Sequence, residues 1–298
     1  MLNSLVRCDG LEDWHVFVNV EPGPDQAAFS EICQKVLPAQ SFTVRINPRV
    51  LGVRGNPYDV LEHVFSNGSA LNICLEEDFV VAPDILQLAL WYERIQAPHL
   101  ACMNFLAGAC GNPGYLSDTQ HPNLFFETEC FNSIGLVLTQ SNWQRMRAFW
   151  LGPDPGLYRV PDKTLQNQNK VAPRHLDIDG WDWSVYAQIL RDPSLSVLQP
   201  VAARCVHAGT TGTYCNADYQ ERAFGHVDLF DGGSTPEAYQ ILPPAELPKA
   251  ARAHVESLHH AADLMRDLYD SRYPRAPLYL RLINRAETWL WGHPLTRR

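Results

Sequence analysis

Residues 71–84 read LNICLEEDFVVAPD, and this stretch decides the fold that the sequence predicts. Its apolar start ends abruptly in three consecutive carboxylates, Glu76, Glu77 and Asp78. A second short apolar run follows, and Pro83-Asp84 then opens a helix. Adjacent acids repel one another and rarely end a buried strand unless positive charge lies beside them. Because carboxylate oxygens suit hard cations such as Mg²⁺ and Mn²⁺, the stretch predicts a divalent cation at a strand end.

The segments around this stretch alternate between strands and helices. Strands are expected at residues 14–21, 42–46, 70–75 and 99–105, and helices at residues 26–37, 56–65 and 84–96. This order predicts an α/β sandwich with a mostly parallel sheet. Ligands of such sheets bind at the carboxyl ends of the strands, which is where the three acids lie.

The second half of the chain alternates less regularly. We expect a β-rich piece at residues 125–138, a helix from Ser141 to Trp150, a polar loop at 152–176, a helix over 183–191 and a strand at 197–200. Residues 245–291 predict a mainly helical, separately organised segment. The expected domains are therefore a principal α/β domain over residues 1–240 and a helical C-terminal extension over 241–298.

The overall composition disfavours some classes of protein. The chain has 298 residues, of which 46% are hydrophobic and 19% charged, and its net charge is -9. A negative charge argues against broad binding to nucleic-acid phosphates, so no nucleic-acid partner is expected. The N-terminal segment does not have the pattern of a signal peptide, and no run of about 18 apolar residues predicts a membrane span.

The eight cysteines are scattered along the chain without a C-x-x-C pair. Most lie in apolar contexts, where a reduced cysteine behaves as a small hydrophobic residue. This usage favours a reducing, cytoplasmic location. A secreted protein with disulfides is the alternative, which the missing signal pattern disfavours.

The three acids need not act together. If they extend the strand, Glu76 and Asp78 lie on one side and Glu77 on the other, so all three cannot bind one ion. One interpretation makes Asp78 the metal ligand and places Glu76 and Glu77 beside ribose or sugar hydroxyls. The alternative is a solvated acidic turn. The position at a strand end favours the functional interpretation.

Further acids precede the helix expected at residue 183. Asp177, Asp179 and Asp182 lie at a loop-to-helix junction, where a carboxylate can reach a proton of the substrate. They could instead cap the helix, which is the interpretation we favour for Asp179. Asp182 lies between Trp181 and Trp183 and is the candidate general base, with Trp181 shaping the acceptor site.

A third candidate group follows the strand at 197–200. His207 is a candidate second metal ligand or phosphate contact, although a single histidine after a strand is more often structural. Arg204 is expected to order a nearby loop. The segment from Gly209 to Gly212 could close over a ligand or form an ordinary turn.

The C-terminal stretch 278–291 is basic and aromatic. It could form a helix that lies on a membrane or on a lipid-linked acceptor, as a peripheral contact. An amphipathic helix packed on the domain is the favoured alternative, because its polar face is only lightly basic.

Four segments, taken in order, resemble those of the GT-A glycosyltransferases. Residues 75–84 are similar to the Glu-Asp-Asp metal motif and the Ala-Pro-Asp that follows it. Residues 131–138, with Trp143, are similar to a Gly-Leu-Gly-Trp segment and its downstream tryptophan. Residues 181–183 are similar to a Trp-Asp-Asp-Trp that supplies the base, and residues 204–212 to a Ser-Arg-Thr…Gly-x-x-Gly loop. The likeness is closest to family 13, the N-acetylglucosaminyltransferase I group, or to a family 2-like member.

The sequence departs from that pattern at three places. The metal motif reads Glu-Glu-Asp, although its last acid is kept as Asp78. The base motif has one aspartate fewer, which leaves the register of Asp182 open by one residue. The family's first strand, which contacts the nucleotide base, should precede a Leu-x-Ser-Leu helix, but here Leu2 to Leu5 begins the chain. We therefore expect the principal domain to lack that strand.

The resemblance implies inverting transfer of a sugar to a hydroxyl of a glycan or another acceptor. The donor would be a nucleotide-diphospho-sugar, with a UDP-sugar favoured. Mn²⁺ or Mg²⁺ held by Asp78 and His207 would neutralise the leaving diphosphate, and Asp182 would take the acceptor proton. The residues that would bind the donor are Glu76, Glu77, Trp181, Arg204 and Gly209.

Two other functions remain open at this point. A catalytically inactive module that binds a nucleotide-sugar or a glycan would explain the missing strand. A nucleotidyltransferase could share the sheet topology, but it normally has a Gly-rich loop with a basic residue near its N-terminus, which this sequence does not show.

Overall fold

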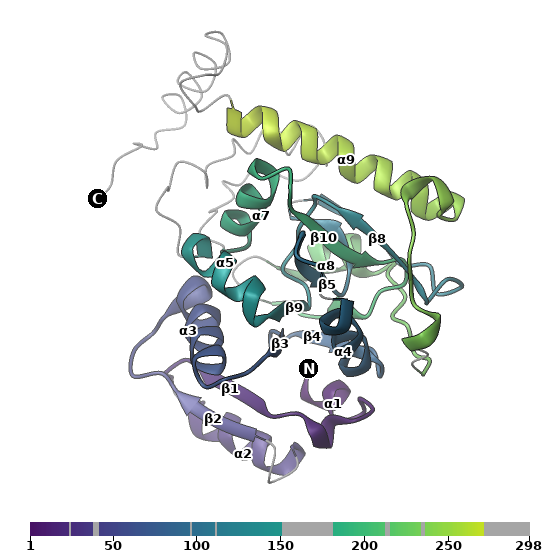
Figure 1. The fold of residues 1–298 in the computed structure, drawn as a ribbon. Helices are drawn as coiled ribbons and strands as arrows, with labels where there is room; N and C mark the ends of the chain where they lie inside the picture. The colour runs from purple at the N-terminus through teal and green to yellow at the C-terminus, as the bar shows by residue number, and fades with distance from the viewer. Residues whose placement is uncertain are drawn as a thin grey trace.

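The computed structural model describes residues 1–23, 25–37, 42–95, 97–110, 112–150, 181–211, 215–233 and 236–270. Its first half alternates between strands and helices, which confirms the predicted order (Figure 1). The elements are α1 Leu2–Leu5, β1 Val16–Val20, α2 Gln26–Val36, β2 Phe42–Ile46, α3 Gly52–Ser66, β3 Leu71–Cys74, β4 Phe79–Val81, α4 Ile85–Ile95 and β5 Leu100–Asn104.

The second half contributes seven short strands and four α-helices within the described residues. Its elements are β6 Ala107–Ala109, β7 Asn112–Leu116, β8 Leu124–Thr128, β9 Leu136–Thr139, α5 Gln140–Trp150, α7 Trp181–Arg191, β10 Ser196–Pro200, β11 Cys205–His207, α8 Ala217–Phe224, β12 Gln240–Ile241 and α9 Lys249–Asp270. The predicted loop at 152–176 lies outside the described residues.

Helix α3 starts earlier than the sequence indicates. It begins at Gly52 rather than at Asn56, and Pro57 lies inside it. The carboxylate of Glu21, at the end of β1, accepts hydrogen bonds from the backbone N–H of Leu51 at 3.0 Å and of Gly52 at 2.8 Å. These bonds satisfy donors that every helix start leaves open. The cap comes from a distant residue, so no local signal predicted it.

The central sheet has six strands in the order β12-β8-β10-β5-β9-β3. The pairs β5–β10 and β8–β12 are parallel, whereas β3–β9, β5–β9 and β8–β10 are antiparallel. The prediction of a mostly parallel sheet is therefore wrong, and the protein is a mixed α/β protein with a mixed sheet. Two strands make the sheet mixed: β9, which follows β5 and β8 in the chain but lies between β3 and β5, and β8, which runs antiparallel to β10.

Three further strand pairs lie outside the central sheet in the described residues, and one of them is the antiparallel pair β6–β7. Strands β1 and β2 form a separate parallel pair, and β4 pairs with β11 in antiparallel register. Within the described residues, β3 is an edge strand of the central sheet, and β9 is its hydrogen-bonded neighbour. The β4–β11 pair sets His207 opposite Phe79, directly after the three acids.

Buried strand residues alternate between two apolar clusters, as expected for a sheet covered on both faces. In β9, Leu136 and Leu138 belong to one cluster and Val137 to the other. The first cluster includes residues of α3, α5, α7 and α9, and the second includes residues of α1, α4 and α8. Helix α9, in the predicted C-terminal extension, thus packs on the core of the main domain.

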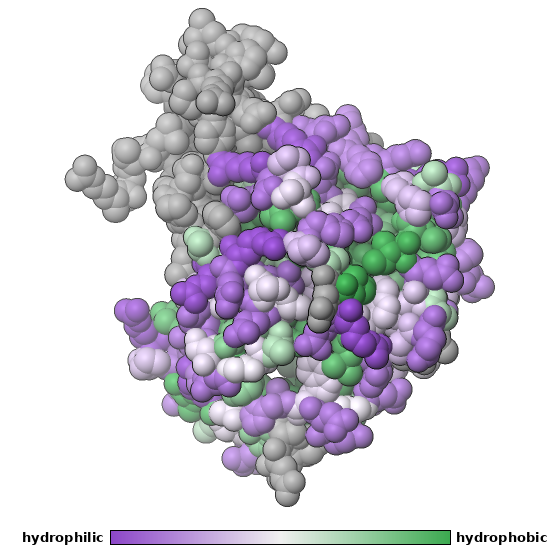
Figure 2. Space-filling view, in the orientation of Figure 1, coloured by the Kyte–Doolittle hydropathy of each residue, from purple (hydrophilic) through white to green (hydrophobic). Residues whose placement is uncertain are grey.

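The outer surface is mainly polar on the face shown in Figure 2, with apolar residues interspersed. No helix in the described part of the chain combines the length and the apolar character needed to cross a membrane. The stretch 278–291, for which we considered a membrane contact, lies outside the described residues.

Candidate functional site

The three acids form the turn that joins β3 to β4. The backbone N–H of Phe79 donates to the carbonyl of Glu76 at 3.3 Å, which closes the turn. Glu77 is exposed, whereas Glu76 and Asp78 are half-buried. Glu77 therefore differs in exposure from Glu76 and Asp78, as strand alternation predicted. A turn, and not an extended strand, produces this difference.

The pairing of β4 with β11 brings His207 to Asp78. The Nε2 atom of His207 lies 2.9 Å from Oδ2 of Asp78. One residue later, the backbone N–H of Ala208 donates to the carbonyl of Asp78 at 2.8 Å. The acid and the histidine are therefore held both by their side chains and by the backbone around them.

Asp78 has one carboxylate oxygen without a protein partner. Its Oδ1 atom is buried and accepts no hydrogen bond from any described residue. A buried carboxylate oxygen without a donor is costly unless a water molecule or an ion supplies its partner. A cation beside Asp78 would satisfy it.

Gly209 lies directly against this carboxylate. A Cβ atom at position 209 would approach Oδ2 of Asp78 to 2.6 Å and Cε1 of His207 to 2.9 Å. Such contacts are too short for a real side chain, so only glycine leaves the carboxylate in its place. Gly209 was predicted to bind the donor, and the structure places it beside the candidate metal ligands.

The pKa of Glu76 is influenced by the neighbouring acids and by Asp182 of α7. Burial raises the pKa of its carboxyl to about 8, and the charges of Asp78, Glu77 and Asp182 add to that rise. Asp182, far away in the sequence, is thus within electrostatic reach of the β3–β4 turn. Asp182 therefore acts on the acidic turn through its charge, over a longer range than the direct contact between Asp78 and His207.

Trp181 and Asp182 form the start of α7 and differ sharply in environment. Trp181 is buried and stacks on Trp150 with ring centroids 3.9 Å apart and an angle of 4°. Its other neighbour is Phe131, which it contacts edge-on. Trp181 therefore anchors the helix in the core, while half-buried Asp182 is presented at its first turn.

Arg204 lies in the core and not at the open site. It is fully buried, and its Nε donates to both oxygens of Asp84 at 3.0 Å. Its other two nitrogens donate to the carbonyls of Ala202 and Pro122. Because each guanidinium nitrogen already has a protein acceptor, these contacts favour a structural role over the predicted contact with the donor.

Two cysteines belong to this region, and no sequence signal identified them. The Cys110 thiol donates to Oδ2 of Asp182 at 3.6 Å. The Cys215 thiol lies 3.8 Å from Nδ1 of His207 and 3.2 Å from the carbonyl oxygen of Gly209. Since Cys215 and Asp78 contact opposite nitrogens of the His207 ring, that ring does not direct both toward a single ion.

The donor set fits a hard cation with few protein ligands. No group of three His, Cys, Asp or Glu side chains within the described ranges is arranged to hold an ion. Asp78 and His207 nevertheless offer an oxygen and a nitrogen beside the buried, unpartnered Oδ1. Mg²⁺ and Mn²⁺ commonly take one or two protein ligands and complete their shells with water and substrate phosphates.

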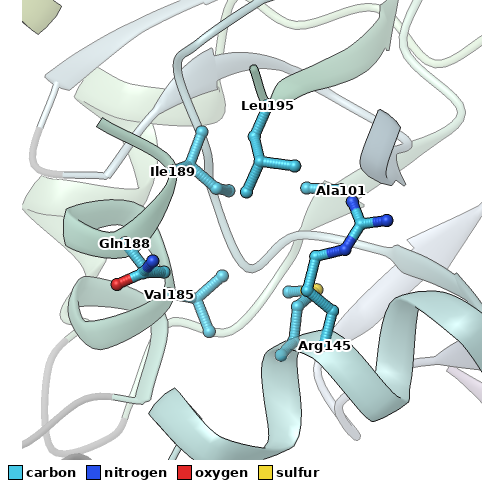
Figure 3. A pocket seen from close by; sticks show the side chains of 7 residues that line it. Ala101, Arg145, Val185, Gln188, Ile189 and Leu195 are labelled. Carbon is cyan, nitrogen blue, oxygen red and sulfur yellow. The ribbon is translucent and has the colours of Figure 1, made fainter. Parts of the chain in front are cut away.

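A small hollow between α5 and α7 is a separate feature (Figure 3). Ala101, Val185, Ile189 and Leu195 give it apolar walls, and Arg145 lies at its side. Its lining side chains include no carboxylate or histidine, so it lacks the chemistry of the region around Asp78.

The remaining predicted acids, Asp177 and Asp179, lie outside the described residues. Among the candidates that are described, Asp78, His207, Gly209, Glu76 and Asp182 gather in one region. Glu77 is in the same turn but exposed.

Comparison with known proteins adds no assignment. No known family model matches this chain, and no curated protein matches it. The likeness to GT-A glycosyltransferases therefore rests on the order of its motifs and stays a prediction.

Proposed function

We propose that this protein is a metal-dependent, inverting glycosyltransferase of the GT-A type. It would move a sugar from a nucleotide-diphospho-sugar, with a UDP-sugar favoured, to a hydroxyl of a glycan or another acceptor. One observation carries the proposal: Asp78 contacts His207 at 2.9 Å and keeps a buried carboxylate oxygen that has no partner among the described residues.

The residues divide the reaction between them. Asp78 and His207 would hold Mn²⁺ or Mg²⁺, which when bound supplies positive charge to the leaving diphosphate. Gly209 leaves room beside that carboxylate. Asp182 takes the proton of the acceptor hydroxyl as its oxygen attacks the anomeric carbon from the face opposite the diphosphate. Attack from that face inverts the configuration of the sugar.

The test separates binding from chemistry with three variants. Calorimetry with Mn²⁺ and UDP, followed by hydrolysis of a panel of nucleotide-sugars, is applied to wild type, Asp78→Asn and Asp182→Asn. We expect Asp78→Asn to lose the metal-dependent affinity for UDP. Asp182→Asn should keep that affinity and lose roughly 100-fold or more in turnover, as for the removal of a general base.

A matched control comes from the residue directly after the helix that carries the base. Asp192 follows the last turn of α7 and bonds the backbone and hydroxyl of Ser194. Asp192→Asn should change neither affinity nor turnover. If no donor is turned over and Asp78→Asn binds UDP and Mn²⁺ like wild type, the proposal fails.

A catalytically inactive nucleotide-sugar or glycan-binding module is the second candidate. Its support is that the metal motif and the base motif both depart from the pattern of the resemblance: the first reads Glu-Glu-Asp, and the second has one aspartate fewer. This candidate predicts metal-dependent UDP binding that Asp78→Asn removes, without turnover of any donor. The same set of measurements therefore distinguishes the two.

A cytoplasmic location remains part of the proposal. All eight cysteines are unpaired and six of them are buried, as is common in reducing compartments. Localisation of a fluorescently tagged full-length chain tests it, and export from the cell would contradict it.

A further inference from the structure

We propose that Cys110 is a positioning residue for Asp182, which its thiol fixes by a hydrogen bond while leaving the carboxylate basic. This inference rests on the proposed function, because it assigns Asp182 the role of general base. The contact itself is the 3.6 Å approach of the Cys110 sulfur to Oδ2 of Asp182.

Both partners of this hydrogen bond are rigidly supported. Cys110 is buried at the end of β6, and its backbone N–H donates to the carbonyl of Phe131 at 2.7 Å. Asp182 follows Trp181, whose ring stacks on Trp150 and contacts Phe131 edge-on. A bond between two anchored groups restricts the orientation of the carboxylate, which a base needs in order to meet its proton.

The choice of a thiol has a chemical consequence. An S–H group is a weak donor, whereas a hydroxyl in its place would donate more strongly to the charged carboxylate. A stronger bond to the charged form lowers the pKa of an acid and makes it a poorer base. Burial, with the neighbouring charge of Asp182, raises the pKa of the Cys110 thiol well above its usual range, so the thiol keeps its proton and remains a donor.

Other titratable groups also act near Asp182. Glu76 reaches it from the β3–β4 turn, Tyr115 from β7 and Tyr219 from α8. Burial raises the pKa of Tyr219 to about 12, so Tyr219 and Glu76 both stay largely neutral at pH 7. Replacing Cys110 alters a group that donates directly to Asp182, at 3.6 Å.

The test compares Cys110→Ser and Cys110→Ala with Cys102→Ser. Cys102 is a fully buried thiol in β5 whose pKa is raised by burial alone, so it controls for the cost of a buried hydroxyl. The carboxyl of Asp182 is titrated by carbon-13 NMR in the metal-free protein, with Asp182→Asn to assign its signal. We expect its pKa to fall by about half a unit or more in Cys110→Ser and to rise in Cys110→Ala.

A kinetic measurement adds a second readout. Cys110→Ala should lower kcat for the donor about tenfold at unchanged donor KM, because the base is present but less well oriented. Cys110→Ser should shift the acidic limb of the kcat profile to lower pH. Cys102→Ser should change neither the titration nor the profile.

The two proposals fail in different ways. If the Asp182 titration is the same in wild type and both Cys110 variants, or if Cys102→Ser shifts it equally, the positioning role is overturned whatever the activity. If the titration shifts as expected but wild type turns over no donor and Asp78→Asn leaves UDP affinity unchanged, the glycosyltransferase proposal is overturned instead. Should Cys110→Ser not fold, Cys110→Ala carries the comparison.

Discussion

Two acid–base pairs join the region around β4 to the segment at residues 204–207, and they differ in how completely they are satisfied. Asp84 and Arg204 are both fully buried, and Tyr239 adds a third hydrogen bond to Asp84 at 3.0 Å. Asp78 and His207 are partly exposed, and one oxygen of Asp78 has no partner within the described residues. Protein groups satisfy the hydrogen-bonding atoms of the first pair. The second pair, Asp78 and His207, can still bind a ligand, and we call it the open pair.

This difference separates structural residues from functional ones that the sequence pattern treats alike. Arg204 and His207 lie three residues apart, and both were predicted to serve the donor site. The guanidinium of Arg204, whose nitrogens all have protein acceptors, also lies over the ring of Phe230, with its Cζ atom 4.1 Å from the ring centroid. Its charge is therefore enclosed by protein groups. The variants below test whether the two pairs differ in energetic terms as they do in geometry.

The largest effect is expected from matched substitutions of the two acids. Asp84→Asn leaves Arg204 buried without a countercharge, and we expect it to lower the free energy of unfolding by about 3–5 kcal/mol. Asp78→Asn removes one charge from an acidic cluster and should change it by less than about 1 kcal/mol. Chemical unfolding of both variants checks this prediction. Equal destabilisation by the two would mean that the Asp78–His207 pair is structural as well.

The second prediction concerns pH. Glu76 has a pKa of about 8 in the folded protein, above the ordinary value of 4.5. The folded chain therefore binds more protons than the unfolded chain between these values, and its stability falls as the pH rises through that window. The slope should reach about 1.4 kcal/mol per pH unit at most, measured by unfolding in metal-free buffer.

Glu76→Gln should remove most of the dependence of the unfolding free energy on pH. Near pH 8 this variant should be more stable than wild type. Its control is Glu77→Gln, because Glu77 is exposed in the same turn. Saturating Mn²⁺ should flatten the slope in wild type, since a bound cation favours the charged carboxylate. A slope that Glu76→Gln leaves unchanged would assign the pH dependence to another group.

How far the sequence predicts this molecule depends on the range of the contacts involved. The order of strands and helices up to Asn104 was correct apart from the extra strand β4, because local periodicity largely determines it. The prediction of a mostly parallel sheet was wrong, because tertiary packing places β9 between β3 and β5 and no local sequence pattern indicates this position. The early start of α3 failed for the same reason, since its cap is the side chain of Glu21.

The candidate site shows the same limit. A run of acids after a strand indicated Asp78, and Gly209 and His207 followed from a motif near the next strands. Nothing in the sequence indicated that Trp181 would be buried in an aromatic stack while Asp182 stays accessible. The partners Cys110 and Cys215 were not predicted either, because a thiol near an acid or a histidine is visible only when the chain is folded.

A third prediction changes the open pair without removing a charge. Gly209→Ala places a methyl group only 2.6 Å from Oδ2 of Asp78, so the carboxylate must move. We expect Mn²⁺ affinity to fall about tenfold, which corresponds to about 1.4 kcal/mol. Gly233→Ala is the matched control, because no atom lies within 4 Å of a Cβ there. Equal Mn²⁺ affinity in both variants would show that Asp78 does not bind the cation in its present position.

The smallest effect is expected at Cys215, on the other side of His207. Cys215→Ser keeps a donor for the carbonyl of Gly209, now 3.2 Å from the sulfur, and for contact with the imidazole. Because the donor is retained, the free energy of unfolding should change by less than about 1 kcal/mol and Mn²⁺ affinity by about twofold or less. Cys215→Ala removes the donor and should lower the affinity further. If both variants bind Mn²⁺ like wild type, Asp78 and the β4–β11 backbone alone fix the position of His207. If Cys215→Ser already abolishes binding, the thiol is part of the cation site, which then consists of Asp78, His207 and Cys215.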